Sequence, residues 1–170
     1  MEFNIESEKE LDNVAEEIYK TLLLKMALEE RTGKKYKATV IGLYGDLGSG
    51  KTTFTKYFAK KFGIKVKDVI SPTFVLQKRF DISCVEEGGK DVPKKEHTHP
   101  FKDFYHLDVY RIDSSKEILS LDWKENISEP HNIILIEWAD KIQDILPDDT
   151  IKMFFESTGE NSRRIKIKIN

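Results

Sequence analysis

The sequence has little of the chemistry that marks secreted or membrane proteins. Cys84 is its only cysteine, which excludes an internal disulfide, and we expect a cytoplasmic protein. No run of 18 apolar residues occurs, and the first ten residues carry four acidic side chains in place of a basic, apolar leader. We therefore expect neither a membrane span nor a signal peptide.

An excess of one charge is also missing. The chain has 28 basic and 30 acidic side chains, a formal net charge of -2. Such a balance provides no overall basic field to attract nucleic acid or anionic lipid, so any contact with RNA is expected to be local or shared with partners. At 170 residues the chain is long enough for one hydrophobic core, and we predict a single domain over residues 1–170.

Apolar periodicity in the first half predicts alternating helices and strands. Helical spacing predicts a helix over residues 8–29, and the continuous apolar run 38–44 is typical of a strand buried on both faces. A second helix follows over residues 54–62, and a second strand lies within 69–80. Residues 81–103 combine glycine, proline and dense charge, and we predict an exposed loop insertion there.

The second half continues the alternation. We predict strands at 104–112 and 133–136, a helix after Ser114, and a terminal hairpin formed by 150–156 and 164–169. This order predicts an α/β fold with a mostly parallel central sheet flanked by helices and a C-terminal β-hairpin.

The segment 45–52, GDLGSGKT, matches the pattern G-x-x-x-x-G-K-[ST] at every fixed position. Glycines let the backbone curl so that amide hydrogens point at phosphate oxygens, and the following helix adds its positive N-terminal end. Lys51 would contact the β and γ phosphates, and the Thr52 hydroxyl would bind Mg²⁺. The strand before the loop and the helix after it meet the structural condition for this motif, so we predict a P-loop NTPase.

The predicted nucleotide-binding residues are those of the loop and the first helical turn. They are Gly45, Asp46, Leu47, Gly48, Ser49, Gly50, Lys51, Thr52 and Thr53.

A P-loop needs a second acidic group to hold Mg²⁺ or its water, usually at the tip of another apolar strand. Glu137 follows the apolar run 133–136, and Asp108 lies near the end of another predicted strand. One of the two is expected to serve the metal, and the other to orient the attacking water. Trp138 and Tyr110 are expected in the core.

Several other residues carry side chains that could serve a site. Thr73, in the segment Ser-Pro-Thr-Phe, offers a hydroxyl that would act near the γ-phosphate. Cys84, His97 and His99 lack the register of a zinc site, which normally has four ligands. No Asn-Lys-x-Asp sequence is present to read guanine, and no arginine finger is obvious, so we expect ATP and weak turnover by the chain alone.

Four segments in this order, GDLGSGKTTF, SPTF, HLDVYR and IEWADKI…LP, closely resemble the TsaE family, formerly called YjeE. The resemblance implies a P-loop ATPase that acts with TsaB and TsaD, and downstream of TsaC, in forming threonylcarbamoyladenosine at position 37 of tRNAs reading ANN codons. It implies that Lys51 binds ATP phosphates, that Thr52 and Glu137 bind Mg²⁺, and that Asp108 and Thr73 are essential for turnover.

The resemblance leaves the adenine contacts open. Family members often carry a hydroxyl early in the first helix, and this position is Leu11 here. An arginine near the C-terminus of the family would correspond to Arg163 or Arg164. The resemblance implies contact with tRNA only through the complex.

Two other readings of the residues stay open. A small-molecule kinase would use the loop 81–103 as a lid over the phosphates. A nucleotide-switched interaction module would bind ATP and a partner with little hydrolysis.

Overall fold

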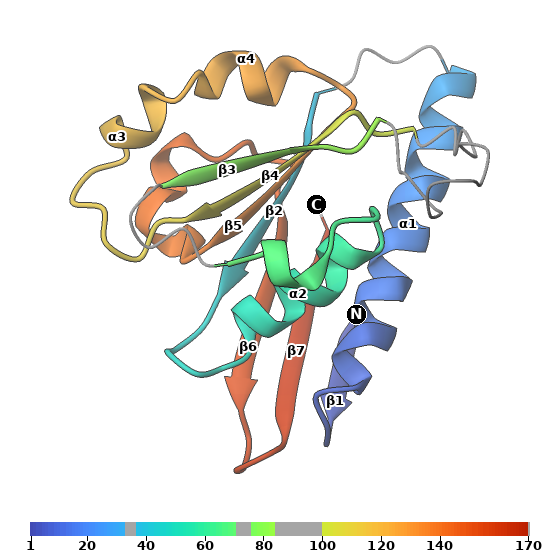
Figure 1. Ribbon diagram of the computed structural model, residues 1–170, viewed down its shortest axis with the longest axis vertical. Helices are drawn as coiled ribbons and strands as arrows, with labels where there is room; N and C mark the ends of the chain where they lie inside the picture. Colours follow the sequence, from blue (N-terminus) through green and yellow to red (C-terminus); the bar gives the residue numbers. More distant parts are fainter. Residues whose placement is uncertain (33–36, 71–75, 84–99, 170) are drawn as a thin grey trace.

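The protein is described by a computed structural model that covers residues 1–32, 37–70, 76–83 and 100–169. One seven-stranded sheet runs through it, with helices on both sides (Figure 1). The elements in chain order are β1 (Glu2–Ile5), α1 (Glu10–Thr32), β2 (Thr39–Tyr44), α2 (Lys51–Lys60), η1 (Val66–Asp68), β3 (Gln77–Asp81), β4 (Asp103–Asp108), α3 (Lys116–Leu119), α4 (Trp123–Ser128), β5 (Asn132–Glu137), η2 (Ala139–Ile145), β6 (Ile151–Ser157) and β7 (Arg163–Lys168).

The strand order is β1-β7-β6-β2-β5-β4-β3. The four central strands β6, β2, β5 and β4 are parallel, whereas β3, β7 and β1 join the edges antiparallel. β6 and β7 form the predicted hairpin, with Phe155 opposite Ile165. The predicted fold class, a mostly parallel sheet with a terminal hairpin, is confirmed.

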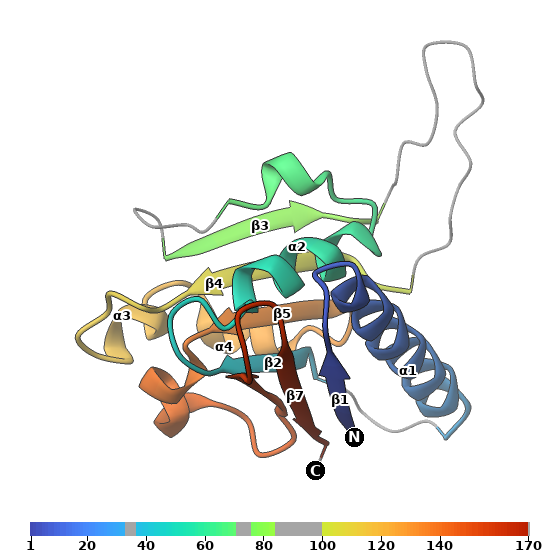
Figure 2. The same cartoon turned by 90° about the horizontal axis from the view of Figure 1, so that it is seen from below.

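Helices cover both faces of the sheet, as Figures 1 and 2 show. Ile133 and Leu135 of β5 pack in a core with α1 and α2, whereas Ile134 and Ile136 pack on the opposite face with α3, α4 and η2. All four side chains are buried. A strand covered on both faces needs apolar residues at every position, which explains the unbroken apolar run in the sequence.

Two predicted boundaries were wrong. The strand predicted at 104–112 ends at Asp108, because its Oδ1 accepts a hydrogen bond of 3.1 Å from the Tyr110 N–H and turns the chain. The loop predicted at 81–103 is shorter at both ends, since Asp81 belongs to β3 and Asp103 begins β4. Ile82 and Phe101, inside that range, are buried apolar side chains of the core. Residues 84–99 lie outside the described part of the chain.

The sequence prediction also missed elements. β1 is a four-residue edge strand in which only Ile5 is buried, so its apolar signal is short. The helix predicted after Ser114 is two helices, α3 and α4, and Asp122 between them has a positive φ of 52°.

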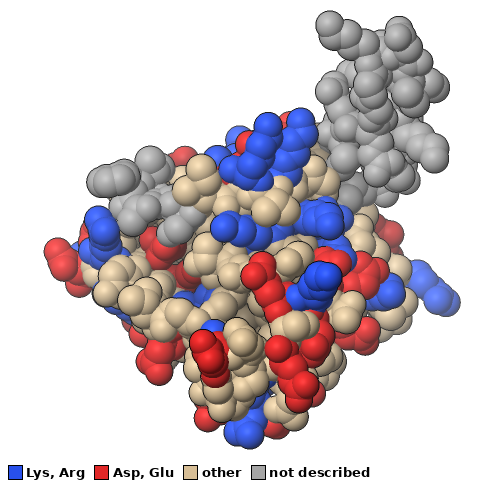
Figure 3. Space-filling view, turned by 60° about the horizontal axis from the view of Figure 1, so that its bottom comes forward, with Lys and Arg blue, Asp and Glu red and all other residues tan. Residues whose placement is uncertain are grey.

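Basic side chains gather over α2, η1 and β3. Figure 3 shows these side chains in blue along the upper part of the face in view, between the two grey segments. The segment 51–67 contains six lysines and no acidic residue, although the whole chain has a net charge of -2. Basic charge is therefore concentrated locally, although the chain as a whole has no excess of it. Within the described ranges, no helix combines the length and the apolar character that crossing a bilayer requires.

Candidate nucleotide-binding site

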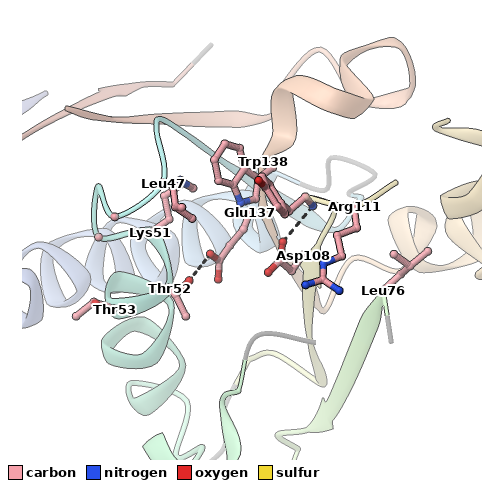
Figure 4. Close-up of a pocket in the computed structure, with 12 residues that line it drawn as sticks. Leu47, Lys51, Thr52, Thr53, Leu76, Asp108, Arg111, Glu137 and Trp138 are labelled. Carbon is pink, nitrogen blue, oxygen red and sulfur yellow. Dashed lines mark hydrogen bonds between the residues drawn. The ribbon is translucent and has the colours of Figure 1, made fainter. Parts of the chain in front are cut away.

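The candidate site lies where three neighbouring parallel strands end. β2 leads into the glycine loop, β4 ends at Asp108, and β5 ends at Glu137. Because parallel strands place their carboxyl ends at the same edge of a sheet, residues far apart in the sequence meet there. The loop, the two acids and the start of α2 line one cavity of about 390 Å³ (Figure 4).

The backbone of the loop depends on glycine. Gly45, Gly48 and Gly50 have φ values of 137°, 78° and 102°, which disfavour other residues. A Cβ at Gly45 would also lie 2.3 Å from the carbonyl oxygen of Phe155. The loop can therefore pack against β6 only because this position has no side chain.

Helix α2 presents its N-terminus to the cavity. Its first intrahelical bond runs from the Phe54 N–H to the Gly50 carbonyl, at 2.9 Å. The N–H groups of Lys51, Thr52 and Thr53 precede that bond, and first-turn amides have no partner within a helix. These three residues line the cavity, so α2 offers it amide hydrogens and the positive end of the helix dipole.

Thr52 and Glu137 both line the cavity and are in hydrogen-bond contact there. The Thr52 hydroxyl lies 2.6 Å from Oε2 of Glu137, and Oε1 of the same carboxylate lies 3.2 Å from the Thr55 hydroxyl. Glu137 is 1% exposed. A hydroxyl and a carboxylate oxygen are ligands that suit Mg²⁺.

Asp108 stands beside this pair. It is the register partner of Glu137 between β4 and β5, so the two acids lie side by side at the ends of neighbouring strands. Asp108 lines the cavity, and its Oδ1 accepts the Tyr110 N–H. Its location near Glu137 agrees with the prediction that the two acids share one site.

Lys51 is folded against its own loop. Its ammonium group donates to the carbonyl oxygens of Gly45 and Asp46, at 2.7 and 2.8 Å, and lies 3.8 Å from the centroid of the Trp138 ring. Burial lowers the pKa of the Lys51 ammonium below its ordinary value, and nearby carboxylates, Glu137 first, oppose that shift. The loop thus holds a desolvated cation whose hydrogen bonds are to neutral carbonyls.

Trp138 reaches Lys51 through an unusual backbone conformation. Its φ and ψ are 63° and 41°, in the left-handed region that costs most residues roughly 1 kcal/mol. The Trp138 ring is only partly buried, and it packs against Tyr110 at 4.8 Å between centroids.

Tyr110 is 47% exposed and lines the cavity, so the prediction that it lies in the core was wrong. The turn after Asp108 carries the Tyr110 ring away from the sheet.

A second cavity of about 450 Å³ lies on the other side of the loop. It shares Gly48, Gly50 and Thr53 with the first cavity. Its remaining lining comes from the segment between β1 and α1, from Leu11, and from Asn161 and Arg163 of the terminal hairpin. Residues of the P-loop therefore line both cavities.

The structure brings most of the predicted residues together. Leu47, Gly48, Gly50, Lys51, Thr52 and Thr53 line the first cavity, along with Asp108 and Glu137. Gly45 and Asp46 hold the Lys51 ammonium, and the Ser49 hydroxyl lies 3.4 Å from it. Thr73 lies outside the described residues.

Sequence reasoning missed three residues. His106 and Thr55 contact Glu137, and Arg111 lines the first cavity. Arg111 is thus a cationic side chain at the cavity, where the sequence offered no obvious arginine. The sequence could have pointed to His106 and Arg111, because both belong to the segment HLDVYR, which ends at the site.

No group of three or more His, Cys, Asp or Glu side chains suited to a metal ion occurs in the part of the chain that is described. Cys84, His97 and His99 lie outside it. A metal at this site would accordingly depend on Thr52, Glu137 and groups that a nucleotide brings.

Comparison with known proteins identifies the family of the chain. The family model "Threonylcarbamoyl adenosine biosynthesis protein TsaE" matches residues 5–165. Proteins named tRNA threonylcarbamoyladenosine biosynthesis protein TsaE are similar to the chain. The one from Bacillus subtilis is 34% identical over 126 residues, covering 74% of this chain and 66% of that protein. The one from Rickettsia typhi is 33% identical over 129 residues, covering 76% of each.

The fold has a solved counterpart. The crystal structure of Bacillus subtilis YdiB superimposes with a TM-score of 0.60, covering 99% of this chain and 84% of that one at 24% identity. The matched segment spans just under two thirds of the Bacillus subtilis TsaE protein. Because the family model extends over residues 5–165, nearly the whole sequence, the chain belongs to the TsaE family.

Proposed function

We propose that the chain binds ATP with Mg²⁺ and hydrolyses it as the ATPase subunit of a tRNA-modifying complex. One observation carries the proposal: the strand–loop–helix motif places Thr52 at 2.6 Å from Glu137, in a cavity that Asp108 also lines. Loop amides, a lysine, a hydroxyl and two acids in one cavity are the parts that a P-loop ATPase uses for positioning and charge stabilisation.

The phosphates would bind between the loop and the start of α2. Amides of Lys51, Thr52 and Thr53 would donate to phosphate oxygens, and the Lys51 ammonium would exchange its carbonyl partners for them. That exchange favours an anion, because two neutral acceptors are replaced by a charged one at a partly desolvated cation. Lys51 must then move away from the face of Trp138.

The metal would be held by Thr52 and Glu137. The hydroxyl and the carboxylate oxygen already converge to 2.6 Å, and both are hard oxygen ligands. Mg²⁺ supplies charge neutralisation across the β and γ phosphates when it is bound. The residues present therefore fit the ion.

Asp108 is the candidate for orienting the attacking water. It lies beside Glu137 on the neighbouring strand, and it lines the cavity on the side of Arg111 and Leu76. With Glu137 assigned to the metal, we assign the orientation of water to Asp108, the other carboxylate that lines the cavity. We include Thr73 as a second contributor near the γ-phosphate.

The nucleoside would occupy the second cavity. The loop residues shared by the two cavities would contact the α-phosphate end, which places the base toward Leu11 and the hairpin. Leu11 offers an apolar surface for a ring. Arg163 reaches the loop itself, with Nη2 at 3.4 Å from the Gly48 carbonyl, and it is our choice for the arginine of the hairpin that serves the site.

In the cell, we propose that hydrolysis supports formation of threonylcarbamoyladenosine at position 37 of tRNAs reading ANN codons, together with TsaB and TsaD. The names of the related proteins support this pathway. Contact with tRNA would be indirect, through the complex. A tRNA-modifying role favours the cytoplasm.

ATP hydrolysis measured with and without TsaB and TsaD tests the proposal. Slow turnover alone and marked stimulation by the two proteins is the expected result. ATP-dependent phosphorylation of a nucleoside without partners would favour a small-molecule kinase instead. Tight ATP binding with no hydrolysis under either condition would favour a nucleotide-switched interaction module.

A further inference from the structure

His106 is buried inside the site and has no part in the chemistry proposed above. It lies on β4, two residues before Asp108, and Nε2 of its ring is 2.9 Å from Oε1 of Glu137. The two side chains are 0% and 2% exposed. Burying a polar ring and a carboxylate costs free energy unless each is paired. The presence of this buried pair at the site therefore needs an explanation.

The surroundings select one tautomer of the ring. Nδ1 of His106 is buried, and within the described residues it has no hydrogen-bond partner. With its hydrogen on Nε2, the ring donates to the Glu137 carboxylate and leaves only a lone pair unpaired at Nδ1. With the hydrogen on Nδ1, an N–H would be buried unpaired and two acceptors would face each other.

The two oxygens of Glu137 consequently have different partners. Oε1 faces His106 and, at 3.2 Å, the Thr55 hydroxyl, whereas Oε2 faces the Thr52 hydroxyl. The single hydroxyl hydrogen of Thr55 also has the Lys51 carbonyl within 2.9 Å. Because the Lys51 carbonyl is closer to the Thr55 hydroxyl than Oε1 is, Thr55 donates to that carbonyl. The N–H of His106 is then the hydrogen-bond donor to Oε1.

We propose that His106 is a positioning residue for the metal-binding carboxylate. By occupying Oε1 from the buried side, it fixes the rotation of the Glu137 carboxylate and keeps Oε2 directed at Thr52 and the cavity. Partners of this kind, behind a metal ligand, typically change metal affinity 10- to 100-fold when removed. The inference rests on the proposed Mg²⁺ site, and it adds a residue that the function as proposed does not require.

Two substitutions at one position separate positioning from packing. His106→Gln places an amide N–H close to the location of Nε2 and keeps the donor, whereas His106→Leu fills similar space without one. The readout is the Mg²⁺ concentration that half-maximally strengthens binding of a non-hydrolysable ATP analogue, measured by calorimetry. Affinity for the same analogue in EDTA reports the metal-independent part of binding.

In the expected result, His106→Leu raises the half-maximal Mg²⁺ concentration about tenfold, and His106→Gln stays within about threefold of wild type. Both variants keep the affinity measured in EDTA. Ile134→Ala is the matched control, because Ile134 is buried on the opposite face of β5 and its loss weakens the core without touching Glu137. This control is expected to keep the wild-type Mg²⁺ response.

A wild-type Mg²⁺ response in His106→Leu overturns the positioning role, and so does equal impairment of the Leu and Gln variants. If Mg²⁺ leaves analogue binding to the wild-type protein unchanged, the proposed metal site itself fails. Nitrogen NMR of the unsubstituted protein gives an independent check that does not need a folded variant. The account requires the His106 hydrogen on Nε2, and a hydrogen on Nδ1 would refute it.

Discussion

The hydroxyl of Thr52 lies 2.6 Å from Oε2 of Glu137, although 85 positions separate the two residues in the chain. The contact arises because β2 and β5 are adjacent parallel strands, with Leu43 opposite Glu137. The loop after β2 then returns Thr52 to the edge where β5 ends. This pair joins the phosphate-binding loop to the acid that we assign to the metal.

Removing either member of this pair should weaken the effect of Mg²⁺. For Thr52→Val and Glu137→Gln we expect the affinity for an ATP analogue in Mg²⁺ to fall about tenfold, which is about 1.4 kcal/mol. Affinity in EDTA should change little, because neither side chain is assigned to the phosphates. Calorimetric titration under the two conditions measures both values.

Thr39→Val is the matched control for Thr52→Val. Thr39 begins β2, at the end of the strand away from the loop, and it is buried. It should leave nucleotide affinity unchanged in both conditions. Equal losses for Thr52→Val with and without Mg²⁺ would contradict the assignment of this hydroxyl to the metal.

Asp108→Asn should separate hydrolysis from binding. An amide keeps the shape of the side chain but orients and activates water poorly, so we expect turnover to fall at least 100-fold. Affinity for ATP should stay within about threefold. Single-turnover hydrolysis together with analogue binding checks the two expectations, with Asp113→Asn, an exposed position after the same turn, as the control. A fall in affinity as large as the fall in rate would instead place Asp108 at the metal.

Nucleotide binding should change the fluorescence of Trp138. Its ring lies 3.8 Å from the Lys51 ammonium, and this contact must loosen when the lysine turns to phosphate. Trp123, the second tryptophan, is 2% exposed on the face covered by α3, α4 and η2, and it should report little. Titrating ATP into wild type and Trp138→Phe tests this, because the signal change should vanish in the variant. A change retained in Trp138→Phe would show that the signal comes from elsewhere.

Burial of Lys51 predicts a pH-dependent cost to the nucleotide-free protein. Its folded pKa is below the ordinary 10.5, so at pH values between the two the unfolded chain binds more protons and the free energy of unfolding rises with pH. Below that window the penalty is fully present, and above it the penalty is gone.

Chemical denaturation of wild type and Lys51→Met over this pH range measures the effect, and the difference between them cancels other titrating groups. Wild type should gain stability relative to the variant as pH rises toward 10.5. A constant difference would argue against a lowered Lys51 pKa.

Much of the fold was predictable because its central strands are buried on both faces. The runs ending at Tyr44 and Glu137 have apolar residues at nearly every position, and they were placed within a residue or so. β1 was not predicted, because an edge strand of four residues with one buried side chain has almost no periodic hydrophobic signal. The end of β4 was predicted too late in the chain, because it depends on one hydrogen bond from a backbone amide to the Asp108 side chain.

The site was predictable as far as its motif extends. GDLGSGKT fixed the loop, and the position of Glu137 after an apolar run pointed to the same edge of the sheet. The pairing of His106 with Glu137 depends instead on strand order and register, which place β4 beside β5. Local sequence carries no such information, and the same holds for the hollow that Leu11 and Arg163 line together.

The most direct test of the account is formation of threonylcarbamoyladenosine on a tRNA reading ANN codons, in a reaction reconstituted from TsaC, TsaB, TsaD and this chain. The account predicts that product forms over repeated turnovers only with the wild-type chain and ATP, and that Asp108→Asn, which still binds ATP, supports at most about a hundredth of the rate. Full product formation with Asp108→Asn, or without this chain, would contradict it.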